Sequence, residues 1–148
     1  MSINLDHERA KFATQRLLSE RFSVCARSAD LKNYRTAVLG AGVEVRQRGI
    51  LQVCAFWASK GDKDRLLLMC DVLSWLLRCD RTAALLPGFP DPTDAVLSVN
   101  SLAGLRSRDL ALLDDEACEI LDWYKRLTEA KYKALERAEG PTKQDAQA

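Results

Sequence analysis

The sequence is short of the residues that build reactive centres. It has one histidine, His7, and none of its five cysteines is arranged as C-x-x-C. A zinc site needs clustered cysteine or histidine ligands, and a cysteine nucleophile needs a histidine beside it. The chain also has neither a P-loop nor a G-x-G-x-x-G motif. We therefore expect no catalytic residues, no metal ion, no cofactor and no enzymatic activity.

Long apolar runs are missing as well. No stretch approaches the roughly 20 apolar residues that a membrane-spanning helix needs. Charged residues interrupt the first eleven positions, where a signal peptide would lie. The odd number of cysteines, mostly in apolar surroundings, is typical of small core residues in a reducing compartment. We expect a cytoplasmic protein that does not bind a membrane.

Charge is balanced over the whole chain but not along it. The formal net charge is +1. The first 48 residues hold nine Lys/Arg against five Asp/Glu, and the remainder holds thirteen against sixteen, so the two parts carry +4 and −3. This asymmetry permits a surface that faces a polyanion without establishing one.

Apolar residues recur at helical spacing nearly throughout, and no segment alternates for long in the manner of a strand. The sequence therefore predicts an all-α fold, a compact single-domain bundle of about six helices. The helical domain is expected to span residues 1–139. Gly140 and Pro141 are expected to end the last helix, and residues 140–148 are expected to form a disordered tail.

Residues 7–29 are predicted to form the first helix. Arg9, Arg16 and Arg27 fall on one stripe of this helix, away from its apolar face. Arg21 instead projects into the apolar side, where it snorkels, pairs with an acid or meets a partner. The positions expected to face inward are Ala10, Ala13, Leu17, Leu18, Phe22, Cys25 and Ala29.

A second helix is expected to begin with Asp30 as its N-cap. Gly40 and Gly42 weaken it by about 1 kcal/mol each relative to alanine, which indicates close helix packing or a bend. Gly49 is a natural stop, since glycine takes the left-handed conformation at a helix end. The inward-facing residues are Leu31, Tyr34, Val38, Ala41 and Val45.

The stretch 50–59 has a single polar side chain, Gln52, before Ser59. It is predicted to form a short helix that is apolar on nearly every side and therefore covered by the other helices. Arg48 and Lys60 mark the points at which its two ends reach water.

Asp62 or Asp64 is expected to start the next helix, in which Trp75 lies partly off the buried stripe. That stripe consists of Leu66, Met69, Leu73, Leu76 and Leu77. Residues 87–92, "PGFPDP", form a loop, and Thr93 is expected to cap the helix that follows. This later helix is predicted to turn Val96, Val99 and Leu102 inward.

The last helix is expected to begin near Asp114, Asp115 and Glu116, because acids suit a helix N-terminus. A magnesium site is the alternative role for these three, but consecutive positions on a helix point to different sides. The residues expected to face inward are Ala117, Ile120, Leu121, Tyr124 and Leu127. Two acid-before-base pairs on its surface have the favourable spacing of four, Asp122–Arg126 and Glu129–Lys133.

The remaining signals are cations on the surface. Arg35 and Arg46 are eleven residues apart and so share a helix stripe. Arginines and lysines at such spacing can neutralise phosphates in a manner that is blind to base sequence and sensitive to salt. A charged stripe is more often a solvated face, so spacing alone leaves both interpretations open.

Four stretches in order carry a resemblance to a known family: "RAKFATQRL", "YRTAVLGAGVEVRQRGILQVCAFWASKG", "LLLMCDVLSWLL" and "ILDWYKRLTEAKYKAL". Together they resemble the small subunit of the type III-B CRISPR effector, the Cmr complex, over about residues 9–135. The family's middle signature is an apolar helix entered through an Asn-Gly-Leu turn and followed by Ala-Phe and a lysine. Here Gly49-Ile50-Leu51, Ala55-Phe56 and Lys60 hold those places. Arg48 replaces the Asn, and Ala41-Gly42 stands where a Leu-Pro is common.

The resemblance implies an all-helical, non-catalytic scaffold whose copies stack head to tail beside the backbone subunits of the complex. The duplex of CRISPR RNA and target RNA lies between the two filaments, and other subunits carry the catalysis. The expected partners are thus other Cmr subunits, further copies of the chain and this duplex. The candidate RNA-binding residues are Arg9, Arg16, Arg46, Arg48 and Lys60, with Lys125 and Arg126 as a second group.

Two other interpretations stay open. One is a helical adaptor that binds only protein, and the other is the small subunit of the related type III-A complex. Stacking of copies needs two different patches on one molecule. Trp75, Trp123 and Phe89 are candidates for such a patch, although packing in the core or in a loop explains each of them as well.

Overall fold

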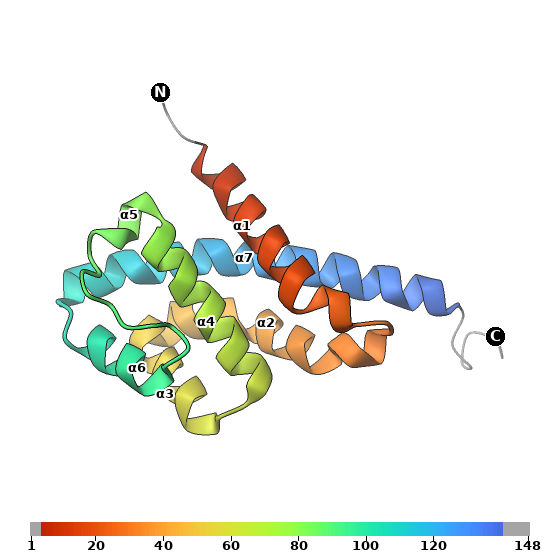
Figure 1. The fold of residues 1–148 in the computed structure, drawn as a ribbon, viewed down its shortest axis with the longest axis horizontal. Coiled ribbons are helices and arrows are strands. Elements are labelled where there is room, and N and C mark those ends of the chain that lie inside the picture. The colour runs from red at the N-terminus through yellow and green to blue at the C-terminus, as the bar shows by residue number, and fades with distance from the viewer. Residues whose placement is uncertain (1–3, 141–148) are drawn as a thin grey trace.

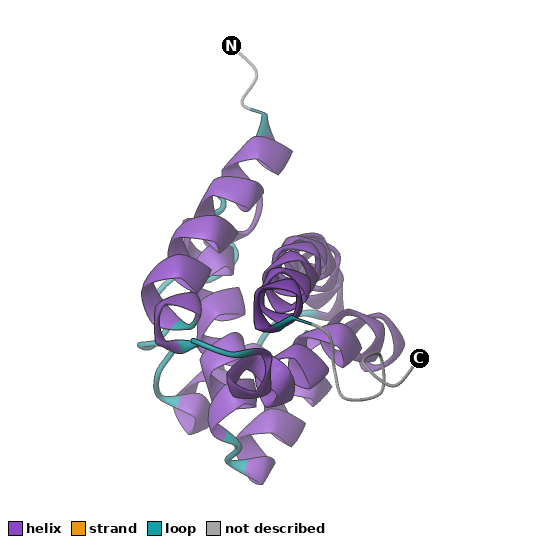
Figure 2. Cartoon of the chain, turned by 90° about the vertical axis from the view of Figure 1, so that its right-hand side faces the viewer, coloured by secondary structure: helices purple, strands orange, loops and turns teal. Residues whose placement is uncertain are grey.

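The computed structural model describes residues 4–140 (Figure 1). Within this range every regular element is a helix, as Figure 2 shows. The elements are α1 (Leu5–Glu20), the short 3-10 helix η1 (Phe22–Val24), α2 (Ser28–Arg48), α3 (Ile50–Lys60), α4 (Lys63–Arg78), α5 (Asp80–Ala83), α6 (Ala95–Ala103) and α7 (Ser107–Glu139). Because α5 has only four residues, six helices form the bundle, which confirms the predicted fold class. No helix among these residues is both long enough and apolar enough to cross a membrane.

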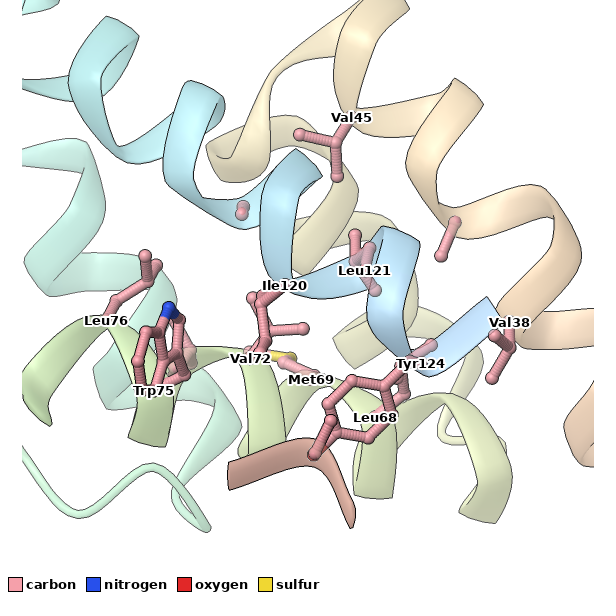
Figure 3. Packing of buried hydrophobic residues seen from close by; sticks show 14 of the residues in the cluster. Val38, Val45, Leu68, Met69, Val72, Trp75, Leu76, Ile120, Leu121 and Tyr124 are labelled. Carbon is pink, nitrogen blue, oxygen red and sulfur yellow. The ribbon is translucent and has the colours of Figure 1, made fainter. Parts of the chain in front are cut away.

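Helix α7 is the axis of the bundle. Its 33 residues span about 50 Å, and α1 to α5 pack along it, while α6 packs against α3 (Figure 1). Its buried positions recur every three or four residues, so one stripe of the helix faces the core throughout. Around Ile120, Leu121 and Tyr124, side chains from α2 and α4 close the core, among them Val38, Val45, Leu68, Met69, Val72 and Leu76 (Figure 3).

The predicted start of α7 near Asp114 is wrong. The helix begins seven residues earlier, at Ser107. Its apolar stripe already includes the partly buried Leu110 and the fully buried Leu113. The three acids therefore lie inside the helix. Gly140 does end it, as predicted, while Pro141 and the expected tail lie outside the described residues.

The first predicted helix is divided in two. Helix α1 ends at Glu20, and η1 turns the chain so that Phe22 and Cys25 still reach the core. The predicted inward positions Leu18 and Ala29 are instead exposed. The helical spacing of apolar residues continues across the turn after Glu20, so nothing in the sequence indicates that the helix ends there.

Helix α2 begins at Ser28, and Asp30 is not its N-cap. The Asp30 carboxylate instead accepts hydrogen bonds from the backbone N–H groups of Ala26 and Arg27. The helix continues through its two internal glycines to Arg48. A Cβ added at Gly42 would meet no atom within 4 Å, so close helix packing does not explain that glycine.

Gly49 joins α2 to α3 as predicted. Its φ of 84° and ψ of 158° belong to a region that essentially only glycine occupies. Its N–H donates to the Val45 carbonyl at the end of α2, and its own carbonyl accepts from Val53 in the first turn of α3. The chain therefore changes direction within a single residue.

Helix α3 is not covered on all sides, contrary to the prediction. Ile50, Val53, Cys54 and Trp57 are buried, while the opposite face of the helix is open to solvent. An 11-residue helix packed against one side of a small bundle keeps one face free even when its sequence is almost entirely apolar.

The remaining elements follow the predicted order with shifted details. Asp62, one of the two predicted starts, caps α4 through hydrogen bonds from the N–H groups of Asp64 and Arg65. Asp94, not Thr93, caps α6. The predicted inward residue Val96 is 75% exposed, because the buried face of α6 is the one that carries Ser98 and Leu102. Trp75 is buried in α4.

Candidate nucleic-acid interface

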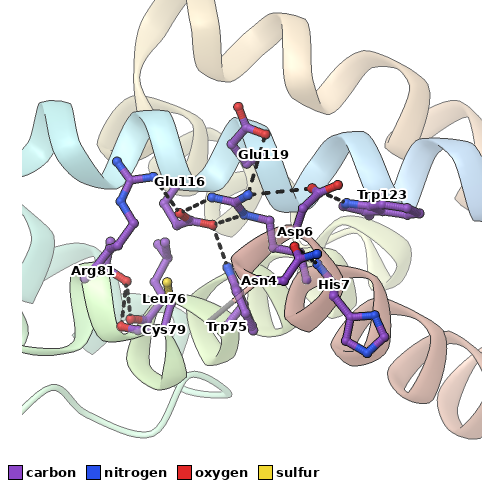
Figure 4. A network of polar contacts seen from close by, with 12 residues as sticks. Asn4, Asp6, His7, Trp75, Leu76, Cys79, Arg81, Glu116, Glu119 and Trp123 are labelled. Carbon is purple, nitrogen blue, oxygen red and sulfur yellow. Dashed lines mark hydrogen bonds and ion pairs between the residues drawn. The ribbon is translucent and has the colours of Figure 1, made fainter. Parts of the chain in front are cut away.

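Arg9 is not on the surface. Only 7% of it is exposed, and its guanidinium forms two hydrogen bonds to the buried Glu116 carboxylate, at 2.7 and 2.8 Å (Figure 4). The Trp75 indole N–H donates to the same carboxylate at 2.9 Å, and Arg81 approaches it from α5. The predicted solvent-facing position of Arg9 is therefore wrong. The residue joins α1 to α7 and α4 and is not available to a phosphate.

The contact between Arg9 and Glu116 shifts the pKa of both groups. The hydrogen bonds to Glu116 raise the pKa of Arg9 above its usual value. Burial would raise the pKa of Glu116, but the hydrogen bonds from Arg9 and Trp75 hold it below its usual value. Both groups are thus ionised, and each compensates the other inside the bundle.

Arg16 is also engaged by acids. Its Nη1 atom lies 2.9 Å from Glu20 Oε1 and 3.8 Å from Asp71 Oδ1, and its guanidinium lies over the Phe12 ring. About a third of the side chain is exposed. Burial of Asp71, with Glu20 beside it, raises the pKa of that carboxyl to about 8.

Arg35 and Arg46 share one face of α2, and that face meets α7. Arg35 binds Glu129 through Nε and Nη2, and Arg46 Nη2 lies 3.4 Å from Asp122 Oδ1. The two acids therefore pair across helices with α2 and not, as predicted, with Arg126 and Lys133 on their own helix. More than half of the Arg46 side chain, 55%, is nevertheless exposed to solvent.

Arg48 and Lys60 stand at the two ends of α3, and both are exposed. Neither forms an ion pair with any residue of the described range 4–140. The Lys60 ammonium lies 5.4 Å from the centroid of the Phe56 ring. Asp115 lines the same shallow depression as Arg48. A carboxylate is therefore nearby at one end of α3 without engaging the arginine.

The exposed face of α3 between these two cations carries no carboxylate. Its exposed residues are Gln52, Ala55, Phe56, Ser59 and Lys60. The neighbouring helix α6 contains no charged residue at all. We call this surface, together with Arg48, the α3 face. It extends about 16 Å along α3, a helix whose sequence contains no acidic residue.

Lys125 and Arg126, the second group, lie on the exposed side of α7. They line a shallow depression together with Asp122, Glu129 and Lys133, so charges of both signs alternate there. Arg126 also covers the Trp123 ring. This surface is a weaker candidate for a polyanion than the α3 face.

Asp114, which lines the depression near Arg48, has a structural partner. Its Oδ1 accepts a hydrogen bond from the backbone N–H of Ile50 at 2.7 Å, so it caps α3 from another helix. Burial raises the pKa of Asp114, and the bond from Ile50 opposes that rise. The three consecutive acids do point to different sides, since Asp115 is exposed and Glu116 is buried.

Reactive groups are scattered in the described residues. No group of three His, Cys, Asp or Glu side chains in the range 4–140 is placed to hold a metal ion. Burial raises the pKa of each of the five cysteine thiols, that of Cys54 to about 12, which disfavours a thiolate nucleophile at neutral pH.

Comparison with known proteins identifies one matching family. The family model described as CRISPR-associated protein (Cas_Cmr5) matches residues 5–131, which is most of the chain and includes α1 to α6 and the greater part of α7. No curated protein and no solved structure gives a significant match. The chain belongs to the Cas_Cmr5 family of CRISPR-associated proteins, and it is a subunit of the Cmr complex that associates with the other subunits of that complex.

Proposed function

We propose that this chain is a non-catalytic structural subunit of a type III-B effector and that its α3 face contacts the backbone of the guide–target RNA duplex. The observation that carries the proposal is the contrast among the candidate arginines. Arg9 and Arg16 are engaged by acids, whereas Arg48 and Lys60 are exposed without an ion-pair partner in the described chain. Arg46, which is half-exposed, extends this surface toward α7.

The chemistry of the α3 face suits phosphate contacts. Paired RNA is recognised mainly by its shape, its 2′-hydroxyl groups and its phosphates, because its deep groove hides the base edges. Two cations separated by the length of α3 can reach separate phosphates, and Gln52 and Ser59 between them offer neutral hydrogen-bonding groups. A near-neutral protein with such a local patch binds RNA best when neighbouring subunits hold the duplex in place.

We also propose that copies of the chain stack through the two ends of the bundle. Trp75 is buried, and Trp123 and Phe89 are partly buried against the core, so none of them forms a bare patch. Exposed apolar side chains occur instead on α6, at Val96 and Leu97, and near the turn between α1 and α2, at Leu18 and Val24. These elements lie toward opposite ends of α7 in Figure 1, as a head-to-tail contact requires.

The alternative is an adaptor that binds only protein within the Cmr complex. The exposed residues Val96, Leu97 and Leu112 favour it, because bare apolar side chains often mark a protein contact. In that case the cations of the α3 face would be solvated and without a ligand.

The test uses the assembled effector complex with Arg48→Ala and Lys60→Ala combined in this subunit. We expect weaker binding of target RNA, because each lost phosphate contact removes a counterion-release contribution. The slope of log Kd against log salt should become shallower by about 0.7 to 0.9 per contact. Titration of labelled target RNA at several salt concentrations measures both quantities.

A matched control removes two exposed cations elsewhere, Lys11→Ala with Lys32→Ala, and so changes the net charge equally. RNA binding should then stay close to that of the unmodified complex. No effect of either double variant would favour the adaptor that does not touch RNA, and equal weakening by both would show that net charge, not the α3 face, sets RNA binding.

A further inference from the structure

Phe56 is the one aromatic ring among the large apolar side chains that are exposed within residues 4–140. It is 38% exposed and lies on the α3 face, pointing away from the buried side of its helix. Its neighbour Trp57 is almost completely buried and fills the core. The packing of α3 rests mainly on Trp57 and its buried companions, while Phe56 leaves more than a third of its surface open to solvent.

The surroundings of this ring are cationic and polar. Lys60 lies one helical turn further on, with its ammonium 5.4 Å from the ring centroid. Gln52 lies one turn earlier, and Ser59 is exposed beside them. No acid lies on this face of α3, and Phe56 is its only large exposed apolar side chain.

We propose that Phe56 is a stacking platform for an unpaired RNA base, while Lys60 holds a phosphate beside that nucleotide and Arg48 holds one further along the strand. This inference rests on the proposed RNA contact and deepens it from the backbone of a duplex to a nucleotide outside the duplex. Surfaces that bind single-stranded nucleic acid combine exposed aromatic rings with cations that follow the backbone. The α3 face has this combination within a single helix.

The occupant is an RNA base for two reasons. A helix face used to dock an apolar protein segment shows several bare apolar side chains at helical spacing, whereas the α3 face shows one ring between polar and cationic groups. The charge of that face is also complementary to a phosphate chain, because its cations have no acid of the described chain as an ion-pair partner.

The experiment compares Phe56→Leu with Phe56→Tyr in the assembled complex. Leucine keeps the apolar character but removes the ring, and tyrosine keeps the ring. We expect Phe56→Leu to weaken binding of a single-stranded target RNA by about 5- to 100-fold, as for loss of one stacked base, and Phe56→Tyr to bind nearly normally. The salt slope should not change in either variant, since no phosphate contact is lost.

A fluorescent base analogue gives a direct readout of stacking. With 2-aminopurine placed in turn at each position of the target RNA, one or more positions should be quenched in the unmodified complex and in Phe56→Tyr. Quenching at those positions should be lost in Phe56→Leu. Thermal unfolding of the isolated variants checks that the exposed substitution leaves the fold intact.

The outcomes separate this inference from the function on which it rests. If both Phe56 variants bind normally and the Arg48/Lys60 double variant binds weakly, stacking is overturned and the phosphate contact stands. If none of the variants alters binding, both proposals are overturned. If Phe56→Leu instead prevents the subunit from entering the complex, the ring meets a protein and the stacking proposal is wrong.

Discussion

Some arginines of the bundle form ion pairs with acids from other helices, whereas the cations of the α3 face do not within residues 4–140. Where α1 and α2 meet α7 and α4, arginines are matched by acids from elsewhere in the fold, as in the pairs Arg9–Glu116 and Arg35–Glu129. At the α3 face, Arg48 and Lys60 have no such partners in the described chain. The same kind of side chain therefore stabilises the protein in the first region and is free for a ligand in the second.

This difference teaches where a functional cation is to be sought. A buried charge requires a partner, because its desolvation costs several kcal/mol. An exposed charge needs none, since exposed ion pairs contribute little to stability. Exposure without a paired acid is thus necessary for a candidate RNA contact, and it excludes structural arginines such as Arg9, which spacing along a helix does not.

The largest expected effect is on the buried pair. Arg9→Ala leaves the Glu116 carboxylate buried with Trp75 as its main remaining hydrogen-bond donor, so we expect a loss of about 3–5 kcal/mol in the free energy of unfolding. The melting temperature should fall by about 10 °C for a domain of this size. Thermal unfolding followed by circular dichroism measures this change.

The matched control for that experiment is Arg48→Ala, which removes the same side chain from the other region. Its free energy of unfolding should change by no more than about 0.5 kcal/mol, as for most surface substitutions. Similar losses in the two variants would contradict the contrast between the two regions.

The second effect is a dependence of stability on pH that comes from Asp71. Its buried carboxyl has its pKa raised to about 8, against about 4 for an ordinary Asp. Between these two values the folded state holds a proton that the unfolded chain releases. The stabilisation is therefore complete below about pH 4 and is lost as the pH rises to about 8, by up to about 1.4 kcal/mol per pH unit.

Asp71→Asn mimics the protonated carboxyl and should remove this slope between pH 6 and 8, so that the variant gains stability relative to the unmodified protein as the pH rises. Urea unfolding at each pH gives the difference. Asp115→Asn, at an exposed carboxylate on α7, is the control and should leave the slope in place. Parallel pH profiles for the unmodified protein and Asp71→Asn would rule out a buried proton.

The smallest effect concerns the junction that positions the α3 face. Asp114→Ala removes the acceptor for the Ile50 N–H, and loss of a helix cap costs about 1 kcal/mol. Asp114→Asn keeps an acceptor oxygen and should retain most of that stability. Urea titration of the two variants tests this, and equal stabilities would mean that the cap across helices contributes nothing.

The sequence predicted the helical bundle well because that prediction depends on local periodicity. The stop at Gly49, the short helix after it and the cap at Asp62 all follow from the chemistry of single residues. The errors occurred where one period ran across a turn, as after Glu20, or where acids lay inside a helix, as at Asp114. In both places the apolar pattern does not change at the true boundary.

The candidate site was less predictable than the fold. Periodicity places Arg9 opposite the apolar stripe of α1 and Arg35 on one face of α2, but it cannot show that α7 brings Glu116 and Glu129 to meet them. The partners are 107 and 94 residues away along the chain. Only the packing of helices sets such pairs, and no local pattern encodes them.

The sequence by itself therefore determined that this chain is helical, that one helix ends at Gly49 and that the chain belongs to its family. Turns, helical periodicity and family motifs all depend on residues close together in the sequence. Only the tertiary structure decided which of the described cations pair with acids inside the bundle and which stay unpaired on the α3 face. The reason is that the state of a charge depends on what surrounds it in space, and the bundle brings those surroundings together from helices far apart in the chain.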